Sequence, residues 1–321
     1  MSGSQYKAII IVLSLINLLF LGWILFGFFE TQELIIEEPE IPLSQFNPEF
    51  NILVASSPGI LVESNDRAVI DFSFKHDGYV TVEFFGDSDR MLAVLITGPS
   101  GSVYVFELIQ GERDIFPLSE GDGEYTVGVY EHLEDDEFGQ VLIVTIDVEL
   151  IDDIAPFIRA NQYVDFCENS RVVEVVNGLT MESDSFFSAV GSILNYVTES
   201  IEYNYELAEN AEHWYLPDLD SIIDQGEGFC FDIAALMVAM LRSRGIPAKL
   251  VVGNYIDIEG RYMYHAWVSV YAEEDGWIGG NIEITGGTWN IIEPTFIARL
   301  GMSEALQLVG DGSNYHPEFY Y

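Results

Sequence analysis

The longest uncharged hydrophobic stretch lies near the start of the chain, from Ala8 to Phe29. As a helix, its 22 residues are long enough to cross a hydrocarbon layer of ~30 Å. A cleaved signal peptide is the alternative, but the stretch is longer than the usual apolar region and no small-residue cleavage pattern follows Phe29. Lys7 precedes the stretch and glutamates follow it, which places the N-terminus in the cytoplasm. The pattern predicts a single-pass anchor in residues 1–30, with all later residues extracellular.

Two different patterns follow the anchor. Residues 31–50 are acidic and carry Pro39, Pro42 and Pro48, which favour extended backbone and predict a stalk. Residues 51–150 contain short runs of β-branched and aromatic residues separated by glycine-rich turns, which predict an antiparallel β-sandwich that binds or spaces. The predicted strands are Arg67–Phe74, Tyr79–Phe85, Met91–Thr97, Val103–Ile109, Tyr125–Tyr130 and Val141–Leu150.

The hydrophobic period changes to that of helices in residues 151–321. Apolar residues recur every three or four positions in Ser185–Ile201, with Ser183 or Asp184 placed to cap an amphipathic helix. A second apolar helix begins near Cys230 and ends before the turn Gly245-Ile246-Pro247. The sequence predicts a second, α+β domain over these residues.

Strands follow the second helix. A strand runs up to Tyr255, and Tyr264–Tyr271 alternates as the next, with His265 and Trp267 on one face. Trp289–Thr295 gives a third strand that ends in the carboxylate of Glu293. The segment therefore combines helices with an antiparallel sheet and presents a cysteine, a histidine and an acid.

Cys230 occupies a position that favours chemistry. It lies in the first turn of its helix, where unpaired N–H groups and the helix dipole stabilise a thiolate. Gly226 and Gly228 allow close approach of a substrate, and the amide of Cys230 is a candidate oxyanion donor. A free cysteine is otherwise often a small buried hydrophobic residue, so this signal is weak alone.

The order of four motifs along the chain strengthens the signal for chemistry at Cys230. The cysteine, Gly-Ile-Pro, His-Ala-Trp-Val and Trp-x-x-x-acid-Pro-Thr resemble the transglutaminase-like superfamily over roughly residues 185–297. The resemblance implies a papain-like core with Cys230 as nucleophile, His265 as general base and Glu293 as the acid that orients the imidazole. The family's aspartate is replaced by glutamate here, which is a departure.

What the resemblance implies about function is amide acyl transfer. A protein or peptide substrate would form a thioester on Cys230, with neither metal nor organic cofactor. Cleavage by a protease or amidase is favoured over crosslinking, since the chain lacks the multi-domain surroundings of crosslinking enzymes. A catalytically inactive domain that serves as a binding or scaffold module is the alternative, with Glu293 then marking a lost triad.

The acidic composition limits which partners the surface of this chain can attract. The chain has 53 acidic and 12 basic residues and a formal net charge of −41, which excludes a surface that attracts nucleic acid or anionic lipid headgroups. Membrane association would therefore depend on the N-terminal helix. The acidity favours solubility in high salt or, alternatively, a cationic substrate.

The remaining candidate residues carry weaker signals. Cys167 and Cys230 are too few for a disulfide framework, although one bridge between them would inactivate the thiol; Cys167 is expected in the core. The acidic loop Glu134–Glu137 lacks the spacing of a calcium loop, so Ca²⁺ is unsupported. His213 and Trp214 precede the cysteine where relatives form a cleft, but packing in the loop is the favoured interpretation. The surface histidines are expected to be His76, His132 and His316.

Overall fold

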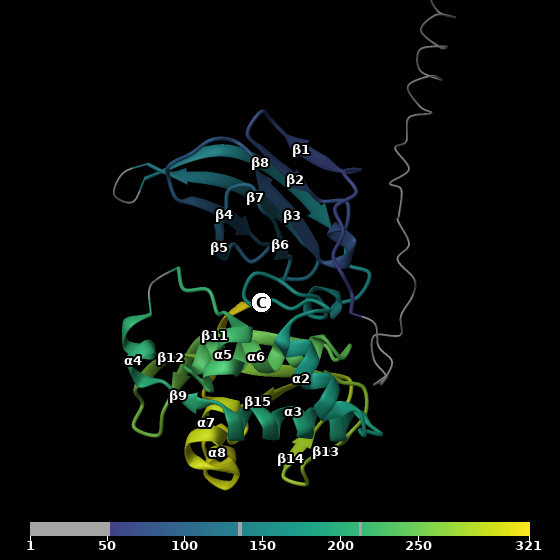
Figure 1. Ribbon diagram of the computed structural model, residues 1–321, viewed down its shortest axis with the longest axis vertical. Coiled ribbons are helices and arrows are strands. Elements are labelled where there is room, and N and C mark those ends of the chain that lie inside the picture. Colours follow the sequence, from purple (N-terminus) through teal and green to yellow (C-terminus); the bar gives the residue numbers. More distant parts are fainter. Residues whose placement is uncertain (1–51, 134–136, 212–213) are drawn as a thin grey trace, which may run out of the picture. The chain divides into compact units, whose positions relative to one another are not determined.

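Two four-stranded antiparallel sheets form the first part of the chain (Figure 1). The computed structural model describes residues 52–133, 137–211 and 214–321. The first sheet has the strand order β1-β2-β3-β6 and the second the order β5-β4-β7-β8. The strands are β1 (Val62–Ser64), β2 (Ala68–Asp71), β3 (Tyr79–Phe84), β4 (Leu92–Thr97), β5 (Val103–Leu108), β6 (Arg113–Pro117), β7 (Gly123–His132) and β8 (Phe138–Val148), with a short 3-10 helix at Lys75–Asp77.

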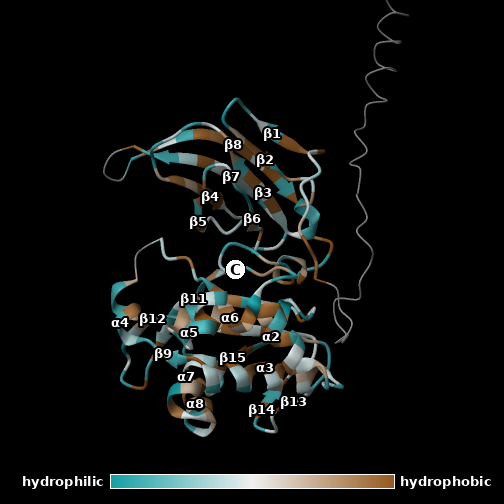
Figure 2. Ribbon diagram, viewed as in Figure 1, coloured by the Kyte–Doolittle hydropathy of each residue, from teal (hydrophilic) through white to brown (hydrophobic). Residues whose placement is uncertain are grey.

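The strands of the two sheets bury alternate side chains. Phe84 of the first sheet and Phe106 of the second are fully buried, and hydrophobic and hydrophilic residues form alternating bands along the strands (Figure 2). Burial of such a side chain contributes roughly 1.5–3 kcal/mol. The six predicted strands are confirmed. β1 and β6 were missed because β1 is exposed and β6 begins with Arg113 and Asp114.

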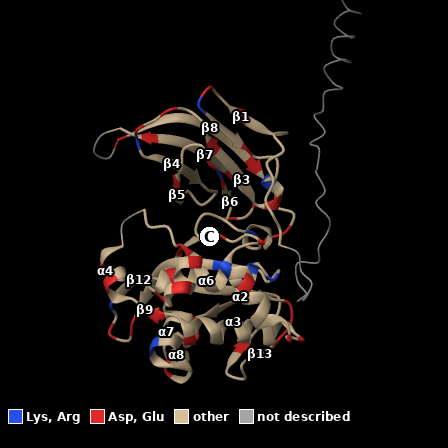
Figure 3. Cartoon of the chain, viewed as in Figure 1, with Lys and Arg blue, Asp and Glu red and all other residues tan. Residues whose placement is uncertain are grey.

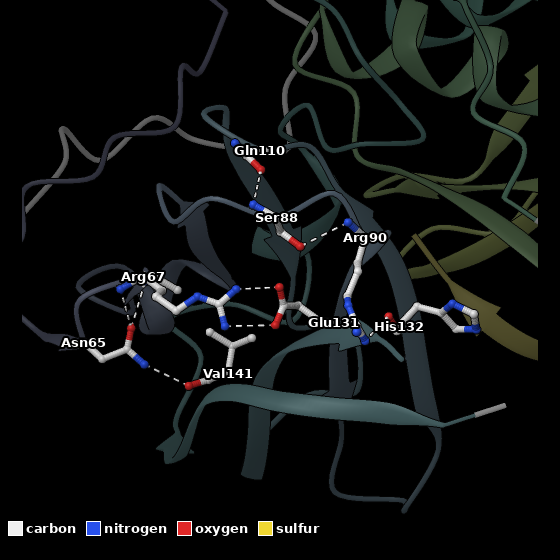
Figure 4. Close-up of polar contacts among 9 residues, drawn as sticks. Asn65, Arg67, Ser88, Arg90, Gln110, Glu131, His132 and Val141 are labelled. Carbon is white, nitrogen blue, oxygen red and sulfur yellow. Dashed lines mark hydrogen bonds and ion pairs between the residues drawn. The ribbon is translucent and has the colours of Figure 1, made fainter. Parts of the chain in front are cut away.

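Polar side chains connect the two sheets at one edge (Figure 4). Arg67, which precedes β2, forms a two-pronged ion pair with Glu131 of β7, with Nη1 donating to Oε2 at 2.9 Å. The arginine holds the pKa of the Glu131 carboxyl below its usual range. Nearby, the Asn65 side-chain amide donates to the carbonyl of Val141 at 2.8 Å. These contacts fix the relation of the two sheets where their hydrophobic core ends.

The second part combines helices with one main sheet, so the predicted α+β class is confirmed. The sheet has the order β15-β12-β11-β16, and two pairs of short strands accompany it. The strands are β9 (Glu202–Tyr203), β10 (Glu227–Gly228), β11 (Ala248–Ile256), β12 (Tyr262–Ala272), β13 (Gly276–Ile278), β14 (Ile282–Ile284), β15 (Thr288–Ile292) and β16 (Tyr315–Tyr320). The helices are α2 (Arg171–Thr180), α3 (Phe186–Ser200), α4 (Tyr205–Asn210), α5 (Leu219–Gln225), α6 (Cys230–Arg242), α7 (Pro294–Leu300) and α8 (Met302–Val309), with a 3-10 turn at Ala155–Phe157.

Helix α6 is the centre of this part. Every residue from Asp232 to Arg242 is buried, as expected of a helix that is hydrophobic on all sides and packs on β11 and β12. Its first turn is capped by Asp232, whose carboxylate accepts from the amide of Phe229 at 3.1 Å and from the Tyr215 hydroxyl at 2.8 Å. The chain then reverses at Gly245, whose φ of 72° favours glycine. The predicted second helix is confirmed.

The first predicted helix is also confirmed as α3, but its cap differs from expectation. Ser185 is the N-cap, in place of Ser183 or Asp184, and it shares a reciprocal capping box with Ser188. The third predicted strand is shorter than expected, because β15 ends at Ile292 and Glu293 caps α7 instead. Edge strand β16 was missed, since its His-Pro-Glu centre is polar and contains a proline.

The predicted anchor Ala8–Phe29 and the stalk lie outside the described residues. Within residues 52–133, 137–211 and 214–321, no helix is both long enough and apolar enough to cross a membrane. The acidic loop also falls largely outside, since residues 134–136 are not described.

A buried arginine joins three segments that are distant in sequence. The Arg242 guanidinium donates to the carbonyls of Ala248 at 2.8 Å, Arg159 at 2.8 Å and Tyr321 at 2.5 Å. Burial lowers the pKa of Arg242 to about 9. The hydrogen bonds satisfy an otherwise costly buried cation and attach the segment that contains Tyr321 to the end of α6.

Replacing Arg242 with methionine is expected to destabilise the fold by about 3–5 kcal/mol, because the buried oxygens of Ala248, Arg159 and Tyr321 each lose a hydrogen bond from a charged donor. Urea unfolding followed by tryptophan fluorescence measures the change. Arg171→Met is the matched control, since Arg171 is exposed on α2, and it is expected to change the free energy of unfolding by less than about 0.5 kcal/mol. Equal effects of the two substitutions would contradict the assigned role of Arg242.

Candidate active site

The fold places Cys230 at the start of α6, partly exposed. The preceding strand β10 pairs in parallel with β9, so that Gly228 lies opposite Tyr203. A side chain at Gly228 would clash with the Asp232 Cβ at 2.8 Å, and the absence of one allows β10 to approach the helix start. The thiol therefore sits at the junction of a tight strand pair and the positive end of a buried helix.

His265 approaches the cysteine from the sheet. It lies on β12 opposite Gly253 of β11, and only 7% of its surface is exposed. Its ring stacks on Phe296 of α7, with centroids 5.0 Å apart and planes 6° apart. His265 Nε2 contacts Glu293 Oε2 at 2.8 Å, and the side chain also interacts with that of Cys230. The structure thus brings the three predicted site residues together.

Glu293 is held by more than the imidazole. It is 2% exposed and is the N-cap of α7, where Oε1 accepts from the amide of Phe296 at 3.2 Å. Its Oε2 accepts from the Tyr315 hydroxyl at 3.2 Å. Burial, reinforced by Glu293, raises the pKa of Tyr315, so this hydroxyl remains a donor. The extra methylene of glutamate is accommodated because the carboxylate reaches the helix N-terminus and the imidazole at the same time.

The electrostatics of the pair favour a charged imidazole. Burial alone lowers the pKa of His265, but the carboxylate of Glu293 and the neighbouring Cys230 outweigh it and raise the pKa to about 10. A carboxylate within hydrogen-bond distance stabilises the cation in this way. At neutral pH the site is therefore arranged to hold an imidazolium beside a thiol, which is the partner that a thiolate requires.

One neighbour of the thiol, Tyr203, was not predicted from the sequence. Its hydroxyl interacts with the Cys230 side chain, and burial, together with the nearby Cys230, raises the pKa of Tyr203 to about 12. The tyrosine reaches the site through the two-residue pairing of β9 and β10. An isolated tyrosine 27 positions before the cysteine is no signal in a single sequence.

Other residues singled out from the sequence lie apart from this group. Cys167 is exposed and both cysteines are free, so its predicted place in the core is wrong and no disulfide blocks the thiol. Cys167 lies in the loop before α2, where its carbonyl accepts from the Ser170 hydroxyl. His76 contacts the carbonyl of Glu149 at 2.6 Å. His213 falls outside the described residues.

Comparison with known proteins supports the same superfamily that the sequence motifs resemble. The sequence model of the Transglutaminase-like superfamily matches residues 173–280, which include the cysteine and the histidine. Residues 173–280 are therefore transglutaminase-like. The uncharacterized protein YebA of Bacillus subtilis is 28% identical over 130 residues, or 34% of this chain. A protein-glutamine gamma-glutamyltransferase of Pseudomonas aeruginosa is 35% identical over 68 residues, or 18% of this chain. The chain covers only 17% and 10% of these two relatives.

Solved structures show a more distant likeness. A protein from Cytophaga hutchinsonii described as a candidate cysteine protease has a TM-score of 0.35 and 17% identity, over 74% of this chain and 69% of that one. Red sea bream transglutaminase has a TM-score of 0.29 and 13% identity, over 68% of this chain and 48% of that one. Scores at this level carry no argument about activity.

Glu293→Gln is expected to lower the pKa of His265 and to slow alkylation of Cys230 by iodoacetamide at pH 7 by about tenfold or more, because the imidazolium loses its counter-ion. Mass spectrometry of the labelled peptide measures the rate. The substituted glutamine retains a side-chain oxygen for the amide of Phe296, so α7 keeps its cap. Glu283→Gln, at the exposed residue of β14, removes the same charge and should leave the rate unchanged. An unaltered rate in Glu293→Gln would refute the electrostatic role of the carboxylate.

A pH dependence of stability follows from the same pair. The pKa of His265 rises from 6.5 to about 10 on folding. The stabilisation that the charged imidazole gives the folded chain is therefore fully present below pH 6.5 and is lost as pH rises through 10. The free energy of unfolding of wild type minus that of His265→Gln is therefore expected to decrease across this interval. Urea titrations at several pH values measure the difference. A difference independent of pH over this interval would show that folding does not raise the pKa of His265.

Proposed function

We propose that this chain is a membrane-anchored, extracellular thiol enzyme that cleaves or transfers an amide acyl group of a protein or peptide through a thioester on Cys230. The observation that supports the proposal is the buried contact of His265 with Glu293 beside Cys230. Helix α6, which bears Cys230, packs on the antiparallel strands β11 and β12, consistent with a papain-like core. Anchoring rests on the apolar stretch Ala8–Phe29.

Each proton in the proposed reaction has a donor and an acceptor. The thiolate of Cys230 attacks the amide carbon, and the carbonyl electrons move to oxygen, near the N–H groups at the start of α6. The His265 imidazolium gives its proton to the departing nitrogen as the C–N bond breaks and a free amine leaves. Water or a second amine then attacks the thioester and gives a proton to the imidazole, and the sulfur is released. Glu293 orients the ring and stabilises its cation throughout.

Hydrolysis is the favoured outcome of the second step. The Pseudomonas aeruginosa relative is named a protein-glutamine gamma-glutamyltransferase, and acyl transfer uses the same thioester. Its similarity to this chain is confined to 68 residues, so its acceptor is a weak guide to the acceptor used here. Cys230 is partly exposed, and water is the acceptor that reaches an exposed thioester without a binding site of its own. The experiment must therefore detect the thioester and then separate the acceptors.

The test incubates the full chain with a library of blocked peptides that contain glutamine, in the presence and absence of hydroxylamine. Wild type is expected to release ammonia or amine and, with hydroxylamine, to form the peptide hydroxamate, because hydroxylamine intercepts the thioester. Cys230→Ala should lose turnover by about 100-fold or more, whereas Cys167→Ala should retain it. Mass spectrometry should find the acyl group on Cys230.

Two results would reject the proposal in favour of a binding or scaffold module. The first is an absence of hydroxamate and of amine release across the library. The second is alkylation of Cys230 by iodoacetamide no faster than that of Cys167, which is exposed in the same molecule. The ratio of hydrolysed peptide to amine adduct, with lysine as the acceptor, distinguishes cleavage from crosslinking.

A further inference from the structure

The last turn of α7 places an arginine against two tyrosines beside the thiol. The Arg299 guanidinium carbon lies 4.8 Å from the ring centroid of Tyr203 and 5.2 Å from that of Tyr205. Its Nε donates to the Tyr205 hydroxyl at 3.2 Å. The two rings contact each other edge to face, with centroids 4.8 Å apart. The stack holds the guanidinium in one orientation.

This arginine is close to the candidate nucleophile. The hydroxyl of Tyr203 interacts with the Cys230 side chain, while the ring of the same tyrosine carries Arg299. Tyr203 therefore neighbours both the guanidinium and the cysteine side chain. Strand β9 places Tyr203 opposite Gly228, two residues before Cys230, so the stacked arginine lies near the start of α6.

Arg299 is exposed and has no carboxylate partner among the described residues. Carboxylates are abundant in this chain, since Asp and Glu outnumber Lys and Arg by 53 to 12 (Figure 3). Other arginines are paired with them: Arg113 with Glu83, Arg171 with Glu174, and Arg261 with Asp257. The terminal nitrogens of Arg299 are thus left as donors next to Tyr203, the residue opposite Gly228 in the strand pair that leads to Cys230.

We propose that Arg299 binds a carboxylate of the acyl donor, which makes acidic peptides the substrate class of this site. A planar guanidinium binds a carboxylate through two parallel hydrogen bonds, and its prior stacking reduces the entropy lost on binding. An acyl donor with a carboxylate close to the scissile amide meets this group as its carbonyl approaches Cys230. The proposal rests on the proposed function, because the ligand is the substrate of the same thiol.

The test compares two alkylating agents that differ in one charge. Iodoacetate and iodoacetamide react with the same sulfur, but only iodoacetate carries a carboxylate, so the ratio of their rates reports a cation near Cys230. The full chain with Cys167→Ala is used, so that Cys230 is the single reactive thiol. Arg299→Gln is expected to lower the iodoacetate rate about fivefold and to change the iodoacetamide rate by less than about twofold. Arg299→Lys should lie between Arg299→Gln and the parent chain.

The matched control is Arg171→Gln, which removes an equal charge from an exposed arginine on α2 that is paired with Glu174. Its ratio of rates should equal that of the parent chain. The same variants are then assayed for kcat/KM on pairs of blocked peptides that carry glutamate or glutamine next to the reacting residue. Only the glutamate peptide should lose rate in Arg299→Gln.

Each other outcome overturns the proposal or its premise. An unchanged ratio in Arg299→Gln overturns carboxylate binding, while rapid alkylation by iodoacetamide still supports the proposed function. Equal slowing with both reagents means that Arg299 only positions Tyr203. Slow alkylation by both reagents in the parent chain, at the rate of an ordinary thiol, rejects the thiol enzyme itself.

Discussion

The contact between His265 and Glu293 is the interaction around which the second part of the structure is arranged. A charged pair away from water is costly unless its remaining polar atoms are satisfied. Here the amide of Phe296 and the hydroxyl of Tyr315 supply the missing hydrogen bonds. Helix α7 begins at the carboxylate, β12 carries the imidazole, and edge strand β16 contributes the tyrosine. One ion pair therefore explains why these three elements meet.

The position of Cys230 depends on a second buried carboxyl group, that of Asp232. Burial raises the pKa of Asp232 to about 6, although the Phe229 amide and the Tyr215 hydroxyl both donate to it. It connects the first turn of α6 to the chain before α5 and packs closely against Gly228. The two acids thus have different roles: Glu293 stabilises the imidazolium, whereas Asp232 fixes the backbone that carries Cys230.

Sequence patterns were sufficient for features that depend on neighbouring residues. The period of α3 and α6 and the alternation of β12 follow from local burial, and the motif order singled out Cys230, His265 and Glu293, which the structure brings together. Tyr203 and Arg299 were not predictable in this way. The first reaches the thiol through a parallel strand pair that is two residues long, and the second through the last turn of a helix far along the chain from the cysteine.

The errors in the sequence-based predictions have similar causes. Cys167 was placed in the core because a free cysteine is usually buried, but the capping of α2 by Ser170 holds its loop at the surface. Strand β16 has the composition of a loop and is ordered by its pairing with β11.

The β-sandwich is joined to helix α6 by packed aromatic rings. Phe106 of β5 contacts Tyr163 at 5.6 Å between centroids, and Tyr163 contacts Phe231, the residue after Cys230, at 5.4 Å. Tyr321 completes the group at 4.8 Å from Tyr163, where the C-terminus of the chain lies (Figure 1). Removing the sandwich would expose these rings and the segment that Arg242 attaches to α6. The start of α6 therefore depends on packing that extends into the sandwich.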